Sequence, residues 1–309
     1  MPVYEGPEKK LEIILSSPVS GLRSDTDGRW KKVVRLSRAQ IISKISNDFM
    51  DACLLSESSL FVREDRILLI TCGKTAPANA LPLLLDLAGK DRVAFLFYEQ
   101  RNFVPSGSPG EFEKDAAEIS KCFPGKCFKL GNADHDYVNC FHCSPAPEKR
   151  QMQPVLQLLM HGIDPGVMQI FCRRGNGSAA RTRSLSGLET LCDPDMKTDD
   201  HLFSPCGYSL NSIRGKDYLA VHITPQPVNS YVSFETSIME NRQQIIGKAL
   251  KIFRPARFSL LLRSGMDDRN SPSFKKVKSV IQGYAVTDRN LYESGCGYAV
   301  TFFNCIRQE

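Results

Sequence analysis

"SSLFVREDRILLITCG", residues 58–73, consists of two short runs of apolar and β-branched residues on either side of a charged stretch. Such runs predict β-strands, and the charged stretch predicts the turn between them. In an antiparallel hairpin with this turn, Ser58 lies opposite Cys72 or Thr71, and directly opposed residues have Cβ atoms roughly 4.5–5.5 Å apart. The stretch therefore predicts a hairpin that opens with a serine beside a thiol or a second hydroxyl.

A second hairpin of the same kind is predicted by "SLNSIRGKDYLAVHIT", residues 209–224. Gly215 and Lys216 suit a two-residue turn that starts with glycine, and counting outward from it places Ser209 opposite His222. Each hairpin is followed by a helical pattern and a further strand, with one strand more in the second half. The order predicts an internal duplication, and we hypothesise that the two serines, the histidine and the thiol converge.

Strand patterns outnumber helical ones along the rest of the chain. Most predicted strands precede or follow another strand, which favours an α+β fold with antiparallel sheets over a doubly wound parallel sheet. The basic, turn-rich segment 173–187 lacks the Gly-Lys-Ser/Thr ending of a phosphate loop and is predicted to be a solvated loop. The further strands are predicted at 11–15, 93–99, 167–172, 230–236, 258–264 and 297–303, and the helices at 79–89, 111–123, 154–163 and 237–253.

Composition excludes several classes of protein. The net charge of +6 on 309 residues is too small and too evenly spread to indicate nucleic-acid binding. No apolar run reaches the ~18 residues of a membrane span, and the charged N-terminus lacks the apolar stretch of a signal peptide. These features predict a cytoplasmic protein with no membrane partner. Eleven cysteines in such a chain predict free thiols rather than a disulfide framework.

"HDYVNCFHC", residues 135–143, contains two histidines and two cysteines, which invites a zinc site. The spacing of His135, Cys140, His142 and Cys143 does not match the usual paired ligands, and the alternation of residue types indicates a strand. We therefore predict no metal.

Six segments resemble the eukaryotic, pyruvoyl-dependent S-adenosylmethionine decarboxylases, in the order of that family and over most of the chain. The resemblance is weak at 100–150 and 265–309, and its specific parts are "LSESSLFV" and the set "PCGYS", "HITP" and "SYVSFE". The matching segments are "YEGPEKKLEI" (4–13), "LSESSLFV" (55–62), "TCG" (71–73), "GIDPGVM" (162–168), "FSPCGYSLN" (203–211) and "HITPQPVNSYVSFET" (222–236).

The resemblance implies one domain over residues 1–309, folded as a four-layer α/β/β/α sandwich of two antiparallel sheets. It also implies that the chain is a proenzyme. The Ser58 hydroxyl attacks the Glu57 carbonyl, and β-elimination leaves a β chain of residues 1–57 and an α chain of residues 58–309. The new N-terminus becomes a pyruvoyl group derived from Ser58. His222 matches the base that removes the Ser58 α-proton, and Ser209 matches the hydroxyl that stabilises the intermediate.

The same resemblance implies the reaction and its substrate. The pyruvoyl carbonyl forms a Schiff base with the amine of S-adenosylmethionine, carbon dioxide leaves, and the product supplies aminopropyl groups for spermidine and spermine. Cys72 matches the proton donor to the product carbon, and Glu8 matches an acid needed near the site. The implied substrate-binding residues are Tyr4 and Phe203, which stack on the adenine, the backbone near Glu57, which reads its edge, and Gln226, which contacts the ribose.

Three departures from the family pattern affect these expectations. Tyr4 replaces a phenylalanine, which preserves stacking. Gln226 replaces a glutamate, which could weaken substrate binding by about 1–2 kcal/mol or change the substrate. Other positions differ at the place where animal members bind the activator putrescine, so we expect no putrescine activation. There, Gln153, Gln157 and Ile70 replace two acids and a lysine, whereas Glu12, Glu235 and Lys9 remain.

Two alternatives stay open. The chain could be a weakly active or inactive paralogue that serves as the regulatory subunit of an active decarboxylase, although such chains usually lose the cleavage serine. It could also keep the pyruvoyl chemistry and act on another substrate. The oligomeric state is not predicted, and a homodimer is one assembly that these features allow.

Overall fold

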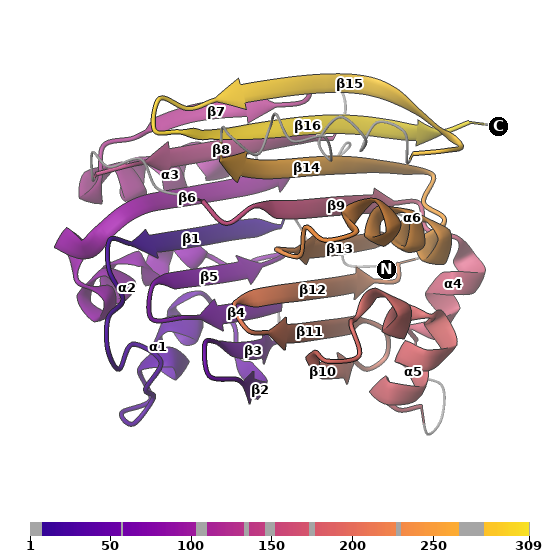
Figure 1. The fold of residues 1–309 in the computed structure, drawn as a ribbon, viewed down its shortest axis with the longest axis horizontal. Coiled ribbons are helices and arrows are strands. Elements are labelled where there is room, and N and C mark those ends of the chain that lie inside the picture. The colour runs from indigo at the N-terminus through magenta and orange to yellow at the C-terminus, as the bar shows by residue number, and fades with distance from the viewer. Residues whose placement is uncertain are drawn as a thin grey trace. The chain divides into compact units, whose positions relative to one another are not determined.

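The computed structural model describes residues 8–56, 58–102, 110–132, 136–145, 152–172, 177–226, 230–265 and 281–308. The chain divides into two compact units, residues 4–149 and residues 150–309 together with the first three residues. Each unit is built on one eight-stranded antiparallel sheet (Figure 1). The predicted fold class of two antiparallel sheets is confirmed. None of the described helices is long and apolar enough to span a membrane.

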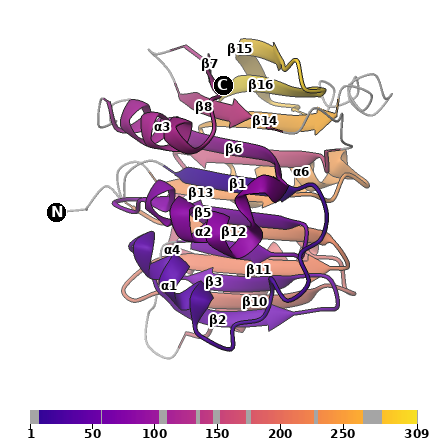
Figure 2. The ribbon, with the colours of Figure 1, turned by 90° about the vertical axis from the view of Figure 1, so that its left-hand side faces the viewer.

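The sheet of the first unit has the strand order β2-β3-β4-β5-β1-β6-β8-β7. The three α-helices described in this unit lie on one face of the sheet (Figure 2), where their apolar side chains share a core with alternate residues of the strands. The elements are β1 (Lys9–Leu15), α1 (Arg29–Leu36), β2 (Ile41–Ser46), β3 (Asp51–Leu55), β4 (Ser58–Val62), β5 (Arg66–Thr71), η1 (Pro77–Ala80), α2 (Leu81–Ala88), η2 (Lys90–Arg92), β6 (Val93–Asn102), α3 (Glu111–Cys122), β7 (Lys126–Leu130) and β8 (Tyr137–Cys143).

The sheet of the second unit has the order β10-β11-β12-β13-β9-β14-β16-β15. A second apolar core joins alternate residues of its strands to α4, η3 and α6. The elements are β9 (Val155–His161), α4 (Pro165–Ile170), α5 (Ala179–Ser186), η3 (Leu188–Leu191), β10 (Lys197–Leu202), β11 (Tyr208–Arg214), β12 (Asp217–Thr224), β13 (Tyr231–Thr236), α6 (Arg242–Phe253), β14 (Arg257–Gly265), β15 (Tyr284–Glu293) and β16 (Tyr298–Arg307).

The internal duplication is confirmed, but its alignment differs from the prediction. Adding eight to each strand number of the first sheet reproduces the order of the second sheet. Hairpin β11-β12 therefore corresponds to β3-β4, and β13 corresponds to β5 rather than being an added strand. The prediction matched the hairpins by their serines, whereas strand order is set by pairing partners that lie far apart in the sequence.

Three local predictions were wrong. Residues 154–163 were predicted as a helix and form β9, which pairs with both β13 and β14. Residues 167–172 were predicted as a strand and belong largely to α4, where Asp164 caps the helix by accepting hydrogen bonds from Gly166 and Val167. A short apolar run does not distinguish a strand buried on both faces from a helix. The predicted loop 173–187 contains α5, which Ser178 caps.

The opposite face of each sheet is unusual because its polar side chains are buried. In β1, Leu11 and Ile13 belong to the apolar core, so strand alternation places Lys10 and Glu12 on the other face, and both are fully buried. In β13 the same alternation places Glu235 on the face opposite the core, 2% exposed. Buried charged and polar side chains need partners, and those partners shape the candidate site.

Candidate active site

Ser58, the first residue of β4, has a strained backbone. Its φ of 134° lies in a region that L-residues rarely adopt, and a residue held there costs of order 1–3 kcal/mol. Its side chain is 3% exposed, and its Oγ has no hydrogen-bond partner within the described part of the chain. A buried hydroxyl without a partner is itself unfavourable. Strain and an unpartnered nucleophile therefore coincide at this serine.

The register of the first hairpin settles which residue faces Ser58. β4 and β5 pair so that Ser58 lies opposite Thr71, and the turn closes with a hydrogen bond from Arg63 N to Arg66 O of 2.8 Å. Cys72 follows Thr71 directly, beyond the last residue of β5, and does not pair with β4. Cys72 is a partly exposed thiol. Of the two predicted partners, the structure therefore selects Thr71.

The register of the second hairpin confirms the prediction. Ser209 on β11 pairs with His222 on β12, and the turn lies between Arg214 and Asp217. Gly215 within it has a φ of 55°, as a two-residue hairpin turn requires. Ser209 Oγ lies 3.0 Å from His222 Nδ1. Turn geometry and a side-chain period of two are sufficient to bring this pair together.

Burial lowers the pKa of His222 to about 3, so the imidazole is neutral at pH 7. A neutral imidazole carries one N–H and one basic nitrogen. If Nδ1–H donates to Ser209 Oγ, then Nε2 is the basic nitrogen and the Ser209 hydroxyl proton can be donated elsewhere. This tautomer equips one pair with both a base and a hydrogen-bond donor.

Glu8 lies in a group of buried charges that the sequence did not reveal. Arg101 Nε is 3.4 Å from Glu8 Oε1, and Arg101 Nη2 is 3.1 Å from Glu99 Oε1. Lys10 Nζ lies 3.4 Å from Glu99 as well. These four residues and Arg66 are at most 6% exposed. The charged residues of "EKKLE" (8–12) and "YEQR" (98–101) are visible in the sequence, but which of them form ion pairs depends on the register between β1 and β6.

The predicted substrate-binding positions are only partly described. Tyr4 and Glu57 lie outside the described residues. Phe203 is half-buried, its N–H donates to Gly207 O at 2.9 Å, and its ring meets His201 edge-on at 4.7 Å between centroids. Gln226 is half-buried just beyond β12, with its N–H donating to Thr224 O at 3.0 Å.

A disulfide joins Cys172 and Cys206 across 34 residues, which corrects the prediction that all cysteines are free thiols. The two residues also form an isolated antiparallel bridge between the end of α4 and the segment that carries Phe203. Gly207 N adds a hydrogen bond to Phe171 O at 3.0 Å. The cysteines are distant in sequence, so spacing could not reveal the pair.

The buried acids named in the putrescine prediction each have a partner. Glu12 forms an ion pair with Arg66 at 2.5 Å. Glu235 accepts hydrogen bonds from Gln157 Nε2 at 2.7 Å and from the Tyr218 hydroxyl at 2.5 Å. The remaining named positions are also engaged or apolar: Lys9 pairs with Glu111 at 2.6 Å, Gln153 donates to Asp217 at 3.0 Å, and Ile70 is buried.

The cysteines and histidines of 135–143 lie mainly on a strand, as their alternation predicted. Cys140, His142 and Cys143 belong to β8, and His135 lies outside the described residues. Burial first and the nearby Lys126 second lower the pKa of His142 to about 4. Within the described ranges, no group of three or more His, Cys, Asp or Glu side chains is placed to hold a metal ion.

Comparisons with known proteins point to one family. The family model for adenosylmethionine decarboxylase matches residues 2–305. The S-adenosylmethionine decarboxylase proenzyme of Trypanosoma cruzi is 34% identical, over 99% of this chain and 89% of its own. The proenzyme of Drosophila melanogaster is 36% identical, over 82% of this chain and 81% of its own.

A solved structure supports the fold. The crystal structure of the Trypanosoma brucei AdoMetDC-delta26 monomer matches 81% of this chain and 99% of its own, with a TM-score of 0.62. Its sequence is 24% identical, so this likeness concerns the fold alone.

Proposed function

Because this chain belongs to the adenosylmethionine decarboxylase family, we propose that it is a self-processing proenzyme whose finished form decarboxylates S-adenosylmethionine. The product is the aminopropyl donor for spermidine and spermine synthesis. The observation that carries the self-processing part is the state of Ser58, a strained residue whose buried hydroxyl has no partner in the described structure. An ordinary structural serine at a strand entrance needs neither feature.

The proposed cleavage uses the Ser58 hydroxyl as an internal nucleophile. Oγ attacks the Glu57 carbonyl carbon, the peptide C–N bond breaks, and the nitrogen takes up the hydroxyl proton, which gives an ester. A base then removes the Ser58 α-proton, a Cα–Cβ double bond forms, and the Glu57 carboxylate leaves. Addition of water and loss of ammonia produce the pyruvoyl group. The step that breaks the peptide also releases the φ strain of Ser58.

Ser209 and His222 supply the two assisting groups in this proposal. His222 is neutral at pH 7, and Nε2 takes the Ser58 α-proton while Nδ1–H holds the ring against Ser209. The Ser209 hydroxyl donates to the oxygen that becomes negative when Ser58 attacks. These roles require the two hairpins to meet in the active protein, as the sequence comparison of the halves led us to expect.

The residues around the finished site bind substrate and move protons. The pyruvoyl carbonyl would supply the electron sink for decarboxylation. Cys72 protonates the product carbon, and its partial exposure permits that role. Glu8 contributes negative charge near the substrate, although Arg101 partly balances it. Tyr4 and Phe203 stack on the adenine, the backbone near Glu57 reads its edge, and Gln226 binds the ribose hydroxyls.

We also propose that putrescine does not activate this enzyme. A diamine needs unneutralised carboxylates in a buried site. Arg66 already pairs with Glu12, and an amide rather than a second acid contacts Glu235. Turnover measured with and without putrescine should be equal, and a clear rise would contradict the proposal.

A denaturing gel tests the processing. The 34.5 kDa chain should yield bands of about 6 and 28 kDa, in proportion to 57 and 252 of its 309 residues. Ser58→Ala should leave one band, and Ser209→Ala and His222→Gln should slow the appearance of two. His142→Gln is the matched control, because His142 is also a buried histidine with a lowered pKa and has no role in the proposed cleavage. A single band from the unaltered chain would refute self-processing and favour the regulatory paralogue.

Mass spectrometry of the reaction tests the substrate. The unaltered protein with S-adenosylmethionine should release carbon dioxide and the decarboxylated product. Cys72→Ser should still be cleaved but should form that product slowly, because a serine hydroxyl is a poorer acid than a thiol. Cleavage without product from the unaltered chain would show that the pyruvoyl chemistry serves another substrate.

A further inference from the structure

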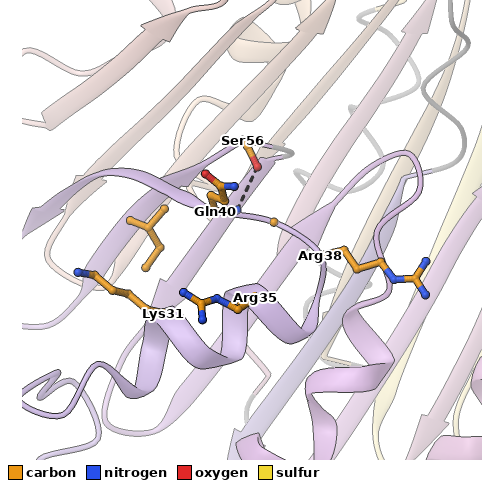
Figure 3. A pocket seen from close by; sticks show the side chains of 7 residues that line it. Lys31, Arg35, Arg38, Gln40 and Ser56 are labelled. Carbon is orange, nitrogen blue, oxygen red and sulfur yellow. Dashed lines mark hydrogen bonds between the residues drawn. The ribbon is translucent and has the colours of Figure 1, made fainter.

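A pocket with a cavity of about 750 Å³ opens beside α1 in the first unit. Figure 3 shows Lys31 and Arg35, one helical turn apart on α1, on one side of the pocket, and Gln40 and Ser56 on the other. Gln40 is the residue before β2, and Ser56 is the residue after β3. Arg38 contributes to the lining, although its guanidinium points away from these four. Ser56, which lines the pocket, lies two residues before Ser58 in the chain. Its volume is within the range of sites for small molecules.

The polar lining of this pocket consists of donors. Lys31 and Arg35 are exposed and form no ion pair or side-chain hydrogen bond within the described part of the chain. Ser56 Oγ accepts a hydrogen bond from Gln40 N–H at 3.0 Å, so the Ser56 hydroxyl proton remains available to donate. The Gln40 side chain adds an amide N–H₂. Among the residues that the structure describes, no carboxylate lines the pocket.

The two cations are not explained by the stability of α1. Like charges at positions i and i+4 destabilise a helix. A basic residue in the last turn can compensate the helix dipole, but this applies to Arg35 and not to Lys31. The last carbonyls of α1 already accept hydrogen bonds from the backbone N–H groups of Ser37, Arg38 and Ala39. The positive charges of Lys31 and Arg35 therefore repel each other, and a bound anion would offset this repulsion.

We propose that this pocket binds a small anion that carries phosphoryl groups, with Lys31 and Arg35 as its cationic ligands and Gln40 and Ser56 as neutral donors. Arg35 can bind two phosphate oxygens with its planar fork, and Lys31 provides a point charge. A bounded recess with four donors favours a compact anion over an extended acidic peptide. The proposal goes beyond decarboxylation and does not depend on it.

Calorimetric titration of the full chain with inorganic pyrophosphate tests this site. We expect saturable binding of one equivalent that weakens as salt is raised, because the ligands are solvent-exposed charges. Lys31→Gln and Arg35→Gln should each weaken binding roughly tenfold, as the loss of one charge-assisted hydrogen bond does. Lys32→Gln is the matched control, because Lys32 is exposed on the same helix but does not line the pocket.

Three outcomes would overturn the proposal. If titration with pyrophosphate gives no saturable heat, Lys31 and Arg35 are only solvated surface charges. Equal losses from Lys31→Gln and Lys32→Gln would show diffuse attraction by surface charge. Tighter binding of hexaglutamate than of pyrophosphate through Lys31 and Arg35 would identify the occupant as an acidic protein segment. Circular dichroism of each variant establishes that it folds. Self-cleavage is measured on a denaturing gel, independently of anion binding.

Discussion

Replacing His222 by glutamine should change how the stability of this protein depends on pH. Burial holds the pKa of His222 at about 3, whereas an unfolded histidine titrates near 6.5. Between those two values the unfolded chain binds a proton that the folded chain does not. The contribution of His222 to the free energy of unfolding is therefore fully present above pH 6.5, and it is lost as the pH is lowered toward 3.

The size of the effect follows from the two pKa values. At pH 5 the unfolded histidine is almost fully protonated, 1.5 pH units below its usual pKa, and each unit is worth 1.36 kcal/mol. His222 should therefore remove about 2 kcal/mol of unfolding free energy between pH 8 and pH 5. Glutamine does not titrate and can still donate a hydrogen bond to Ser209, so the His222→Gln chain should lose about 2 kcal/mol less over this range.

Urea denaturation at pH 8 and pH 5 measures this difference. The measurements belong in a Ser58→Ala background, so that every sample is one uncut chain. His201→Gln is the control, because His201 is only half-buried. If His222→Gln loses as much stability as its parent between the two pH values, the burial of a neutral imidazole is refuted, and with it the proposal that His222 serves as a base at neutral pH.

Three further predictions concern other parts of the molecule. Ser58→Gly should be about 1–2 kcal/mol more stable than Ser58→Ala, because glycine tolerates the φ of 134°; equal urea midpoints would argue against strain. Cys172→Ser should lower stability by about 3–4 kcal/mol, the loop-closure value for a bridge across 34 residues; dithiothreitol should reproduce this loss in the parent and leave the variant unchanged. Gln157→Glu should destabilise the chain at pH 8, because the 2.7 Å hydrogen bond from Gln157 to Glu235 would become a contact between two carboxylates. Putrescine should partly restore the melting temperature of this variant and leave that of the parent unchanged.

Local rules explain which parts of the site could be predicted. The pairing of Ser209 with His222 follows from a glycine turn and the alternation of side chains, both of which act within 16 residues. The turn of the first hairpin was predicted as well, but two registers remained open there. Its charged turn lacks a glycine to define the count, so only the folded sheet shows that Thr71 rather than Cys72 faces Ser58.

Residue patterns alone were enough to predict the antiparallel class of both sheets, the second hairpin and the family, because these depend on local pattern and on motifs in a fixed order. Tertiary structure decided that 154–163 is a strand, since only its neighbours β13 and β14 bury it on both edges. It also decided the Cys172–Cys206 disulfide, the Arg101 ion pairs and the strain at Ser58. The disulfide and the Arg101–Glu8 ion pair arise from contacts between segments far apart in the sequence, and a local pattern carries no information about which distant segments meet.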